Sequence, residues 1–357
     1  MKRLVIVTRC LLSGGAERVV SELANYAVKI GIECSVIMLD EYEVFYKVND
    51  SIKLYTIGKQ SSNPLLDKFK RYKKVRSIVK SLEPDLVLTL PEDIGIYVIP
   101  AMLGSGVPVV VSERNNPWVM PYNKLSRIMR KIFYPFASGY VFQTKMAASF
   151  FSKKIQEKGC VIPNPLDTNK IPLPYLGERK RVIVSAGRLD NQKNFKLLID
   201  SFAEFYKTHP DYSLRIYGEG NLRNELEVYA ESVLGTENWS MPGRNLGWLN
   251  ESYDCAMFVL SSDYEGMPNA LIEAMAAGIP CISTDCPSGG SAELIINNKN
   301  GILVPVGNKK AIFDAMCELS KDKELAKRLS INAVELKVRL SLDKIAKEWF
   351  NYMGKVM

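Results

Sequence analysis

The sequence predicts an α/β protein made of two domains, each built from strand–helix–strand units. At 357 residues the chain is too long for one typical domain, and about two are expected. Short apolar runs alternate with helical patterns, and the runs end in glycines or polar residues, as buried parallel strands do. This alternation begins at Leu4 and restarts at Val182, so each half of the chain predicts a sheet of its own.

Composition narrows the class of protein. Apolar residues make up 47% of the chain, which is sufficient for two cores, and no apolar run reaches the roughly 18 residues of a membrane-spanning helix. Arg9 interrupts the first apolar run, which favours a strand over a signal peptide. The seven cysteines lack paired C-x-x-C spacing, so we expect neither disulfides nor zinc, and a reduced cytosolic compartment. His209 is the only histidine, which excludes a histidine dyad or triad.

Charge is distributed unevenly along the chain. Residues 1–165 hold 24 Lys and Arg against 14 Asp and Glu, a balance of +10. The remaining residues hold 23 against 25, a balance of −2. Such asymmetry indicates that the first half faces something anionic.

The first half opens with a strand, a glycine turn and a helix. The turn is Ser13-Gly14-Gly15, and it aims backbone N–H groups and the positive end of the helix at an anion. Glycines placed there for tight packing are an equally good explanation. The expected elements are strands at Leu4–Thr8, Cys34–Leu39, Leu86–Leu90 and Val107–Val111, and a helix from Ala16 to about Lys29.

Polar residues follow the strand Val107–Val111. They include Glu113, Arg114 and Asn115 in the segment SERNNP. Open parallel sheets bind ligands at the carboxyl ends of their strands. These three residues are therefore candidates for ligand contact.

Two stretches of the first half, residues 63–85 and 122–140, are both basic and apolar. Each is explained equally well by an ordinary amphipathic helix with solvated lysines or by a peripheral membrane surface. The membrane interpretation predicts docking through Lys68 to Arg76 and Lys124 to Lys131. Nucleic acid is not expected as a partner, because no recognition module accompanies the charge.

The second half follows a proline-rich boundary near residues 165–178. A strand, Val182–Ala186, leads into GRLDNQKN, and Arg188 and Lys193 in this loop are a candidate pyrophosphate clamp, because charge-assisted bonds to phosphate are short and strong. An Arg–Lys pair on a loop is more often only solvated. The next strand, Leu214–Tyr217, runs into Gly218-Glu219-Gly220.

The stretch from Ser261 to Gly290 combines groups for an anion with groups for hydroxyls. After the apolar run 257–260, Pro268 is expected as the first residue of a helix over Asn269–Ala277 that Gly278 ends. A strand at Ile279–Ser283 and the turn PSGG follow. Glu265 and Glu273 bracket the loop and the helix start, and a sugar nucleotide needs both acids and N–H groups. The alternative is a solvent-facing Glu273 beside an ordinary turn.

The segments SGGAER, SERNNP, GRLDNQKN, EGMPNALIEAMAAGIP and CPSGG resemble glycosyltransferase family 4, in particular its branches for bacterial surface polysaccharides. The resemblance covers nearly the full chain and is strongest from Val182 to Val306. It implies the GT-B architecture, in which two Rossmann-like domains face each other across a cleft. The acceptor-binding domain would span 1–170, the nucleotide-sugar domain 171–340, and a helix at 341–357 would cross back to the first domain.

The resemblance also implies roles for residues. Arg188, Lys193 and Glu265 would be catalytic, and Glu113, Arg114 and Asn115 would lie on the sugar or acceptor side, although many relatives have a histidine where Arg114 stands. Glu273 would bind the ribose and Glu265 the sugar. The donor contacts would be Gly14, Gly15, Gly218, Gly243, Met267, Pro268, Asn269, Ala270 and Glu273.

The expected activity is retaining transfer of a hexose or N-acetylhexosamine from a nucleotide sugar, UDP-linked on family frequency, to a glycan acceptor. The acceptor would be an oligosaccharide, expected to be polyprenyl-diphosphate-linked, in capsule, O-antigen or exopolysaccharide synthesis. No cofactor or metal is expected: the chain has no D-x-D pair, and the basic clamp would replace Mg²⁺. We expect a cytoplasmic enzyme, peripheral on the anionic inner leaflet of the cell membrane.

Three other classes of protein are alternatives. A nucleotide-sugar epimerase of the same architecture usually enlists histidines that this chain lacks. A dehydrogenase with two Rossmann domains needs a G-x-G-x-x-G that does not occur here. A non-catalytic sugar-nucleotide binder stays open.

Overall fold

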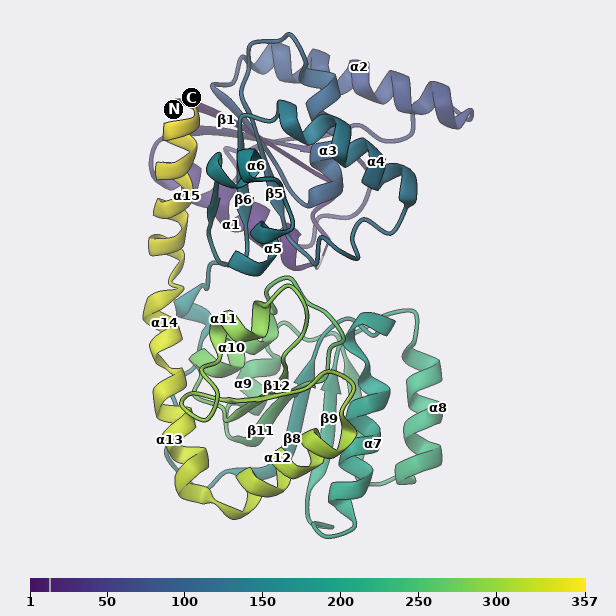
Figure 1. Cartoon of the computed structure of the whole chain (residues 1–357), viewed down its shortest axis with the longest axis vertical. Coiled ribbons are helices and arrows are strands. Elements are labelled where there is room, and N and C mark those ends of the chain that lie inside the picture. The colour runs from purple at the N-terminus through teal and green to yellow at the C-terminus, as the bar shows by residue number, and fades with distance from the viewer. Residues whose placement is uncertain (13) are drawn as a thin grey trace. The chain divides into compact units, whose positions relative to one another are not determined.

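The computed structural model describes residues 1–12 and 14–357 (Figure 1). Ser13, part of the expected glycine turn, lies outside the described residues. The chain divides into two units: residues 1–165 together with 342–357 form unit 1, and residues 166–341 form unit 2. Each unit contains one fully parallel sheet, so the α/β class expected from the sequence is confirmed.

Unit 1 is built on a sheet whose order within the described residues is β3-β2-β1-β4-β5-β6-β7. The central strands are apolar along their whole length because helices cover both faces of a parallel sheet. Leu4 of β1, for example, lies between Cys34 of β2 and Leu86 of β4, and all three are buried. The strands are β1 Arg3–Thr8, β2 Glu33–Met38, β3 Lys53–Thr56, β4 Leu86–Thr89, β5 Val109–Glu113, β6 Gly139–Phe142 and β7 Gly159–Val161.

The helices of unit 1 include one from the C-terminal end of the chain. α15, Leu342–Val356, contacts α1 and buries Ile345, Trp349 and Met353. The others are α1 Gly15–Lys29, α2 Pro64–Leu82, α3 Glu92–Met102, α4 Lys124–Phe133, the 3₁₀ turn η1 Tyr134–Phe136, α5 Lys145–Ser149 and α6 Lys153–Glu157.

Unit 2 repeats the plan with the strand order β10-β9-β8-β11-β12-β13. Its strands are β8 Lys180–Ala186, β9 Ser213–Tyr217, β10 Trp239–Gly243, β11 Cys255–Leu260, β12 Cys281–Thr284 and β13 Ile302–Val304. Its helical segments are η2 Thr168–Lys170, η3 Asn191–Lys193, α7 Phe195–Tyr206, α8 Arg223–Leu234, α9 Trp248–Ser252, α10 Asn269–Ala276, α11 Gly290–Leu294, α12 Lys309–Lys321, α13 Lys323–Ala333 and α14 Glu335–Arg339.

Both sheets reverse their strand order beside their first strand, between β1 and β4 and between β8 and β11. In open parallel sheets, ligands bind at the carboxyl ends of the strands at such a switch point. The loops after β8 and β11, and those after β1 and β4, are therefore where sites are expected.

Two local expectations are wrong in detail. Pro268 is the N-cap of α10 rather than its first residue, because its ψ of 107° is extended, and the helix starts at Asn269. β5 is shifted two residues along and ends at Glu113 instead of Val111, because Ser112 and Glu113 still pair with Val141 and Phe142 of β6.

Candidate active site

The switch point of the unit 2 sheet brings two loops together. The loop after β8 runs from Gly187 to Asn194, and the loop after β11 runs from Ser261 to Pro268. Asp263 donates its backbone N–H to the Gln192 carbonyl at 2.9 Å, and Asn194 Nδ2 donates to Asp263 Oδ1 at 2.7 Å. These bonds hold two segments some 70 residues apart in the sequence in one fixed arrangement.

Glu265 is the centre of this arrangement. Its Oε1 accepts a hydrogen bond from Ser262 Oγ at 2.7 Å and forms an ion pair with Lys193 Nζ, while its Oε2 accepts from Gln192 Nε2 at 3.2 Å. The side chains of Glu265 and Lys193 are only 7% and 13% exposed. The structure therefore joins two of the three predicted catalytic residues directly, in a buried, charge-balanced pair.

These bonds leave Glu265 with spare capacity. An ionised carboxylate offers about four lone-pair sites. Three donors, Lys193, Ser262 and Gln192, are bonded to it. One further hydroxyl donor can be accepted, which suits a polyhydroxylated ligand.

Arg188 differs from Lys193 in its surroundings. Its side chain is 70% exposed, and its Nε pairs with Asp190 Oδ2 at 2.9 Å. A guanidinium has five N–H donors in a planar fork, so one ion pair leaves donors for a second anion. Arg188 and Lys193 lie on the same short loop, one exposed and one buried.

The start of α10 presents backbone N–H groups to this edge of the sheet. The N-cap Pro268 makes no side-chain cap hydrogen bond, Met267 precedes it, and Asn269 and Ala270 are the first two residues of the helix. A helix N-terminus attracts anions through its N–H groups and its dipole. Gly290 closes the other side of the loop, since a Cβ there would collide with the Gly266 carbonyl oxygen.

Glu273 projects from α10 four residues past the helix start. It is half-buried, and its Oε2 accepts a hydrogen bond from Trp248 Nε1 at 3.1 Å. Trp248 begins α9 and is buried against Tyr217 and Phe258. Trp248, Gln192 and Ser262 are not predicted as site residues, because the sequence around a single tryptophan, glutamine or serine does not indicate which side chain it will contact.

Gly218 and Gly243 allow the neighbouring strands to end close to the same loop. Gly218 has φ of 149°, and a Cβ on it would collide with the Gly187 carbonyl oxygen. Gly243 has φ of 89°, and its carbonyl accepts the Gly218 N–H at 2.9 Å. Both positions therefore require glycine for conformation or close approach, whatever binds there.

The predicted residues of unit 1 have different surroundings. Gly14 is the N-cap of α1, and the Glu17 side chain lies against it, where a Cβ would be. Glu113 is 1% exposed and accepts a hydrogen bond from Tyr134 Oη at 2.6 Å. Burial is the largest effect on the Glu113 carboxyl and raises its pKa.

Arg114 is also buried. It donates to Asn164 Oδ1 and, at 3.4 Å, to Ser112 Oγ, and its guanidinium lies 5.7 Å from the centre of the Trp349 ring of α15. Asn115 is half-buried, and its Oδ1 accepts from the Asn116 N–H at 2.8 Å. Glu113 and Arg114 are thus held inside unit 1, and of the three only Asn115 has appreciable exposed surface.

Among the residues that the structure describes, no group of three or more His, Cys, Asp or Glu side chains is arranged to hold a metal ion. The charged groups of the unit 2 site can act on a ligand electrostatically. A lysine, an arginine and a helix N-terminus can bind a diphosphate, and two carboxylates beside them can accept hydroxyl donors.

Family models identify the class of protein. The model described as "Glycosyltransferase Family 4" matches residues 13–170, and the one described as "Glycosyl transferases group 1" matches residues 172–336. Together they span nearly the whole chain. The chain belongs to the family 4 glycosyltransferases and has the GT-B fold.

Individual relatives agree with this class. Two are Campylobacter jejuni enzymes. A "GalNAc-alpha-(1->4)-GalNAc-alpha-(1->3)-diNAcBac-PP-undecaprenol alpha-1,4-N-acetyl-D-galactosaminyltransferase" is 26% identical over 363 residues, covering 100% of this chain and 99% of the relative. An "N-acetylgalactosamine-N,N'-diacetylbacillosaminyl-diphospho-undecaprenol 4-alpha-N-acetylgalactosaminyltransferase" is 29% identical over 378 residues, covering 99% and 100%. Anabaena Alr3699/HepE, solved with UDP and glucose, superposes with a TM-score of 0.84 at 16% identity, covering 99% of this chain and 100% of that one.

Proposed function

We propose that the protein transfers a hexose or N-acetylhexosamine from a UDP-sugar to a polyprenyl-diphosphate-linked glycan, with retention of configuration, in bacterial surface-polysaccharide synthesis. The observation that carries the proposal is the Lys193–Glu265 pair at the switch point of the unit 2 sheet, with Arg188 exposed on the same loop. The printed names of the two Campylobacter relatives, which describe undecaprenyl-linked acceptors, support the acceptor class. The UDP-bound Anabaena structure supports the donor class.

In this proposal the diphosphate lies against Arg188, Lys193 and the start of α10. The bond between the anomeric carbon and the phosphate oxygen breaks, and the acceptor hydroxyl forms its bond on the same face. Its proton passes to the leaving phosphate oxygen. The cations stabilise the charge that develops on the diphosphate, which is usually the largest catalytic term.

The two carboxylates, Glu265 and Glu273, have different roles. Glu265 accepts a sugar hydroxyl with its remaining lone pair and keeps the Lys193 ammonium in position. Glu273, oriented by the Trp248 indole, accepts the ribose hydroxyls of the nucleotide. Binding and positioning by such groups require no metal ion.

Incubation of the protein with a panel of UDP- and GDP-sugars tests the proposal. Thermal shift selects the donor, and UDP release is then followed with and without a polyprenyl-diphosphate glycan. A transferase releases UDP faster with the acceptor, and the anomeric configuration of the product reports retention. Interconversion of the sugar without release would indicate an epimerase, and stabilisation without turnover a non-catalytic binder.

We further propose that the enzyme docks on an anionic membrane through α4. The outer face of this helix and of the following turn carries Leu125, Ile128, Ile132 and Phe136, each more than half exposed, with Lys124 and Lys131 exposed beside them. An apolar helix face flanked by lysines fits the boundary between headgroups and acyl chains of anionic lipid. Among the described residues no helix is long and apolar enough to cross a membrane.

The structure changes which residues of the two basic stretches can touch lipid. Arg127 and Arg130 of α4 donate to backbone carbonyls of residues 117–121, and Arg130 is buried against Phe150 and Phe151. In α2, Arg71 and Arg76 likewise donate to carbonyls of Leu39 and of residues 101–103. The arginines named here are therefore structural. The apolar face of α4 and its lysines remain exposed, as do Leu66 and Phe69 of α2, whereas Lys74 of α2 donates to the Ile57 carbonyl.

Liposome co-sedimentation tests the docking. We expect binding to anionic vesicles that weakens but persists at high salt, because apolar insertion is not screened. Ile128→Glu should abolish it. Ile331→Glu, which changes a similarly exposed isoleucine in unit 2, should bind as wild type does. Equal binding of both variants, or no binding of the wild type at low salt, would contradict the proposal.

A further inference from the structure

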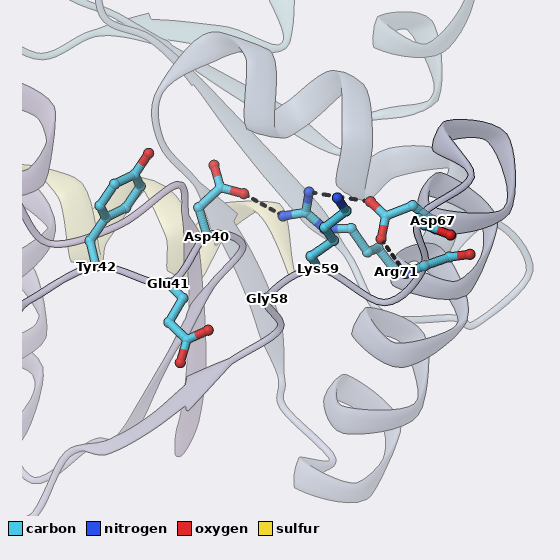
Figure 2. Close-up of a pocket in the computed structure, with 9 residues that line it drawn as sticks. Asp40, Glu41, Tyr42, Gly58, Lys59, Asp67 and Arg71 are labelled. Atoms are coloured by element: carbon cyan, nitrogen blue, oxygen red, sulfur yellow. Dashed lines mark hydrogen bonds and ion pairs between the residues drawn. The ribbon is translucent and has the colours of Figure 1, made fainter.

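Unit 1 contains a cavity of about 500 Å³ that lies apart from the sequence-predicted residues. It lies at the carboxyl ends of β2 and β3, beside the start of α2, and is lined by Asp40 to Tyr42, Gly58, Lys59, Ser61, Ser62, Asp67 and Arg71 (Figure 2). Its volume is within the roughly 300–1,000 Å³ of small-ligand sites. The carboxyl ends of parallel strands are also where such sheets bind ligands.

One wall of the cavity is a fixed ion-pair network. Arg71 pairs with Asp40 at 2.6 Å and with Asp67 at 3.9 Å, and Figure 2 shows it lying between the two carboxylates. Asp67 is further bonded to the backbone N–H groups of Gln60 and Ser61 at 2.5 and 2.9 Å. The bond from Gln60 is the largest influence on Asp67 and lowers its pKa, so this carboxylate stays charged.

Other lining residues carry side chains outside this ion-pair network. Among the described lining residues, the side chains of Glu41, Tyr42 and Lys59 make no hydrogen bond or ion pair, and Figure 2 shows Glu41 and Tyr42 apart from the Arg71 network. Gly58 faces Glu41, and a Cβ on Gly58 would lie 3.6 Å from Glu41 Oε2. A hydroxyl acceptor, an aromatic ring and a hydroxyl-binding ammonium thus border one space.

The charge of the lining selects between ligand classes. Three carboxylates and two cations line it, and Arg9 adds a third cation by pairing with Asp40, so the charges balance and no net positive charge is available for a phosphate or diphosphate. Asp40 is paired with Arg71 and Arg9, and Asp67 is paired with Arg71, so Glu41 lacks the unpaired partner acids that a cation would need. A neutral polyhydroxylated ring suits the lining, because a carboxylate accepts from its hydroxyls and a tyrosine ring packs on its apolar face.

We propose that this cavity is a subsite for a neutral sugar ring of the acceptor glycan, with Glu41 accepting its hydroxyls and Tyr42 packing on its face. The inference rests on the proposed transferase function, since it assigns a sugar of the acceptor to unit 1. It identifies a part of the acceptor, a neutral hexose or N-acetylhexosamine residue, that contributes to binding.

Saturation-transfer NMR on the full chain tests the subsite, with methyl α-N-acetylgalactosaminide and methyl α-glucoside as probes. At least one probe should bind the wild type, and Glu41→Gln and Tyr42→Ala should each weaken its binding about tenfold, the size expected for losing a charged hydrogen bond or an aromatic contact. Glu43→Gln, an exposed acid two residues along that does not line the cavity, is the matched control and should bind as wild type.

A parallel titration with UDP separates the two proposals. UDP binding should be unchanged in all three variants, since their residues lie in unit 1. If UDP binds but neither glycoside does, or if the variants bind the glycosides as well as wild type, the subsite is refuted and the transferase proposal stands. If pyrophosphate binds and Lys59→Gln abolishes that binding, the cavity is an anion site and the subsite is refuted. Failure of UDP and UDP-sugars to bind would overturn the transferase proposal. The glycoside signal alone would then show whether the cavity binds a sugar.

Discussion

The first six strands of the unit 1 sheet follow the same order as the six strands of the unit 2 sheet, yet the carboxyl-end edges of the two sheets are built differently. At the switch point of unit 2, charged side chains from two loops pair with one another below the surface, as Lys193 and Glu265 do, while Arg188 on the same loop is exposed. In unit 1 three charged residues at the ends of β4 and β5 turn inward, since Glu92, Glu113 and Arg114 are all buried. The exposed polar cavity of unit 1 lies instead beyond β2 and β3. Identical strand order therefore fixes where a site can form without fixing which loops form it.

The largest expected effect tests whether unit 2 carries the catalytic residues. Arg188→Ala and Lys193→Ala should each reduce sugar transfer roughly 100-fold or more, because each removes a charge from the developing diphosphate. Only Lys193→Ala should also destabilise the fold, since it leaves the buried Glu265 unpaired, whereas Arg188 is exposed. Steady-state kinetics measures sugar transfer, and urea unfolding measures stability. Near wild-type turnover in either variant, or loss of wild-type activity in EDTA, would refute the metal-free clamp.

This difference between the two sheet edges explains why the site of unit 2 could be predicted from the sequence and the cavity of unit 1 could not. In unit 2 the residues that meet are carried by motifs with a fixed spacing from the end of a strand, so GRLDNQKN and EGMPN predict a shared edge once the alternation of strands is recognised. The sequence gives no comparable motif after β2 or β3. Glu41 and Tyr42 are an ordinary acid and an ordinary tyrosine until folding places them against Gly58 and Lys59.

The burial of charged side chains was the second property that could not be predicted from the sequence. Glu113 and Arg114 follow the apolar run of β5, which favoured an exposed polar loop. The strand instead continues to Glu113, and Tyr134, Asn164 and Trp349 supply partners from elements that are distant in the sequence. Which face of α4 packs on unit 1 could not be predicted for the same reason. Arg130 of this basic helix lies inward, and its isoleucines lie outward.

Arg114 tests whether unit 1 uses its charged residues for structure. Arg114→Ala removes a buried charge-assisted bond to Asn164 and a contact with the Trp349 ring, and should lower the free energy of unfolding by about 2 kcal/mol. UDP affinity should not change. Urea unfolding and calorimetry with UDP measure the two quantities, and Arg188→Ala provides the control with unchanged stability. A fully stable Arg114→Ala that has lost transfer would show instead that Arg114 contacts substrate.

The two carboxylates of unit 2 provide a finer comparison within one site. Glu273→Ala should weaken UDP binding about tenfold, or about 1.4 kcal/mol, because it removes the acceptor for the ribose hydroxyls and leaves the Trp248 N–H without this partner. Glu265→Gln should spare UDP binding and impair transfer, since Glu265 is assigned to the sugar. Glu231→Ala, on the exposed face of α8, is the calorimetric control. Equal losses of UDP affinity in the two site variants would refute this division.

The last prediction concerns how the stability of unit 1 depends on pH. Glu92 begins α3 and is buried, and its Oε2 accepts the Arg114 N–H at 3.3 Å. Burial, then the charges of Glu113 and Asp93, raises the pKa of Glu92 to about 8. Between its ordinary value of 4.5 and about 8, the folded chain keeps a proton that the unfolded chain has lost. The free energy of unfolding should therefore fall as pH rises through this window, by at most about 1.4 kcal/mol per pH unit.

Glu92→Gln removes this dependence, because an amide is neutral in both states. We expect the variant to unfold at nearly the same urea concentration across the window, and to gain stability over the wild type as the pH rises towards about 8. Glu43→Gln, exposed in the same unit, should retain the wild-type slope. An unchanged slope in Glu92→Gln would show that Glu92 is ionised in the folded protein.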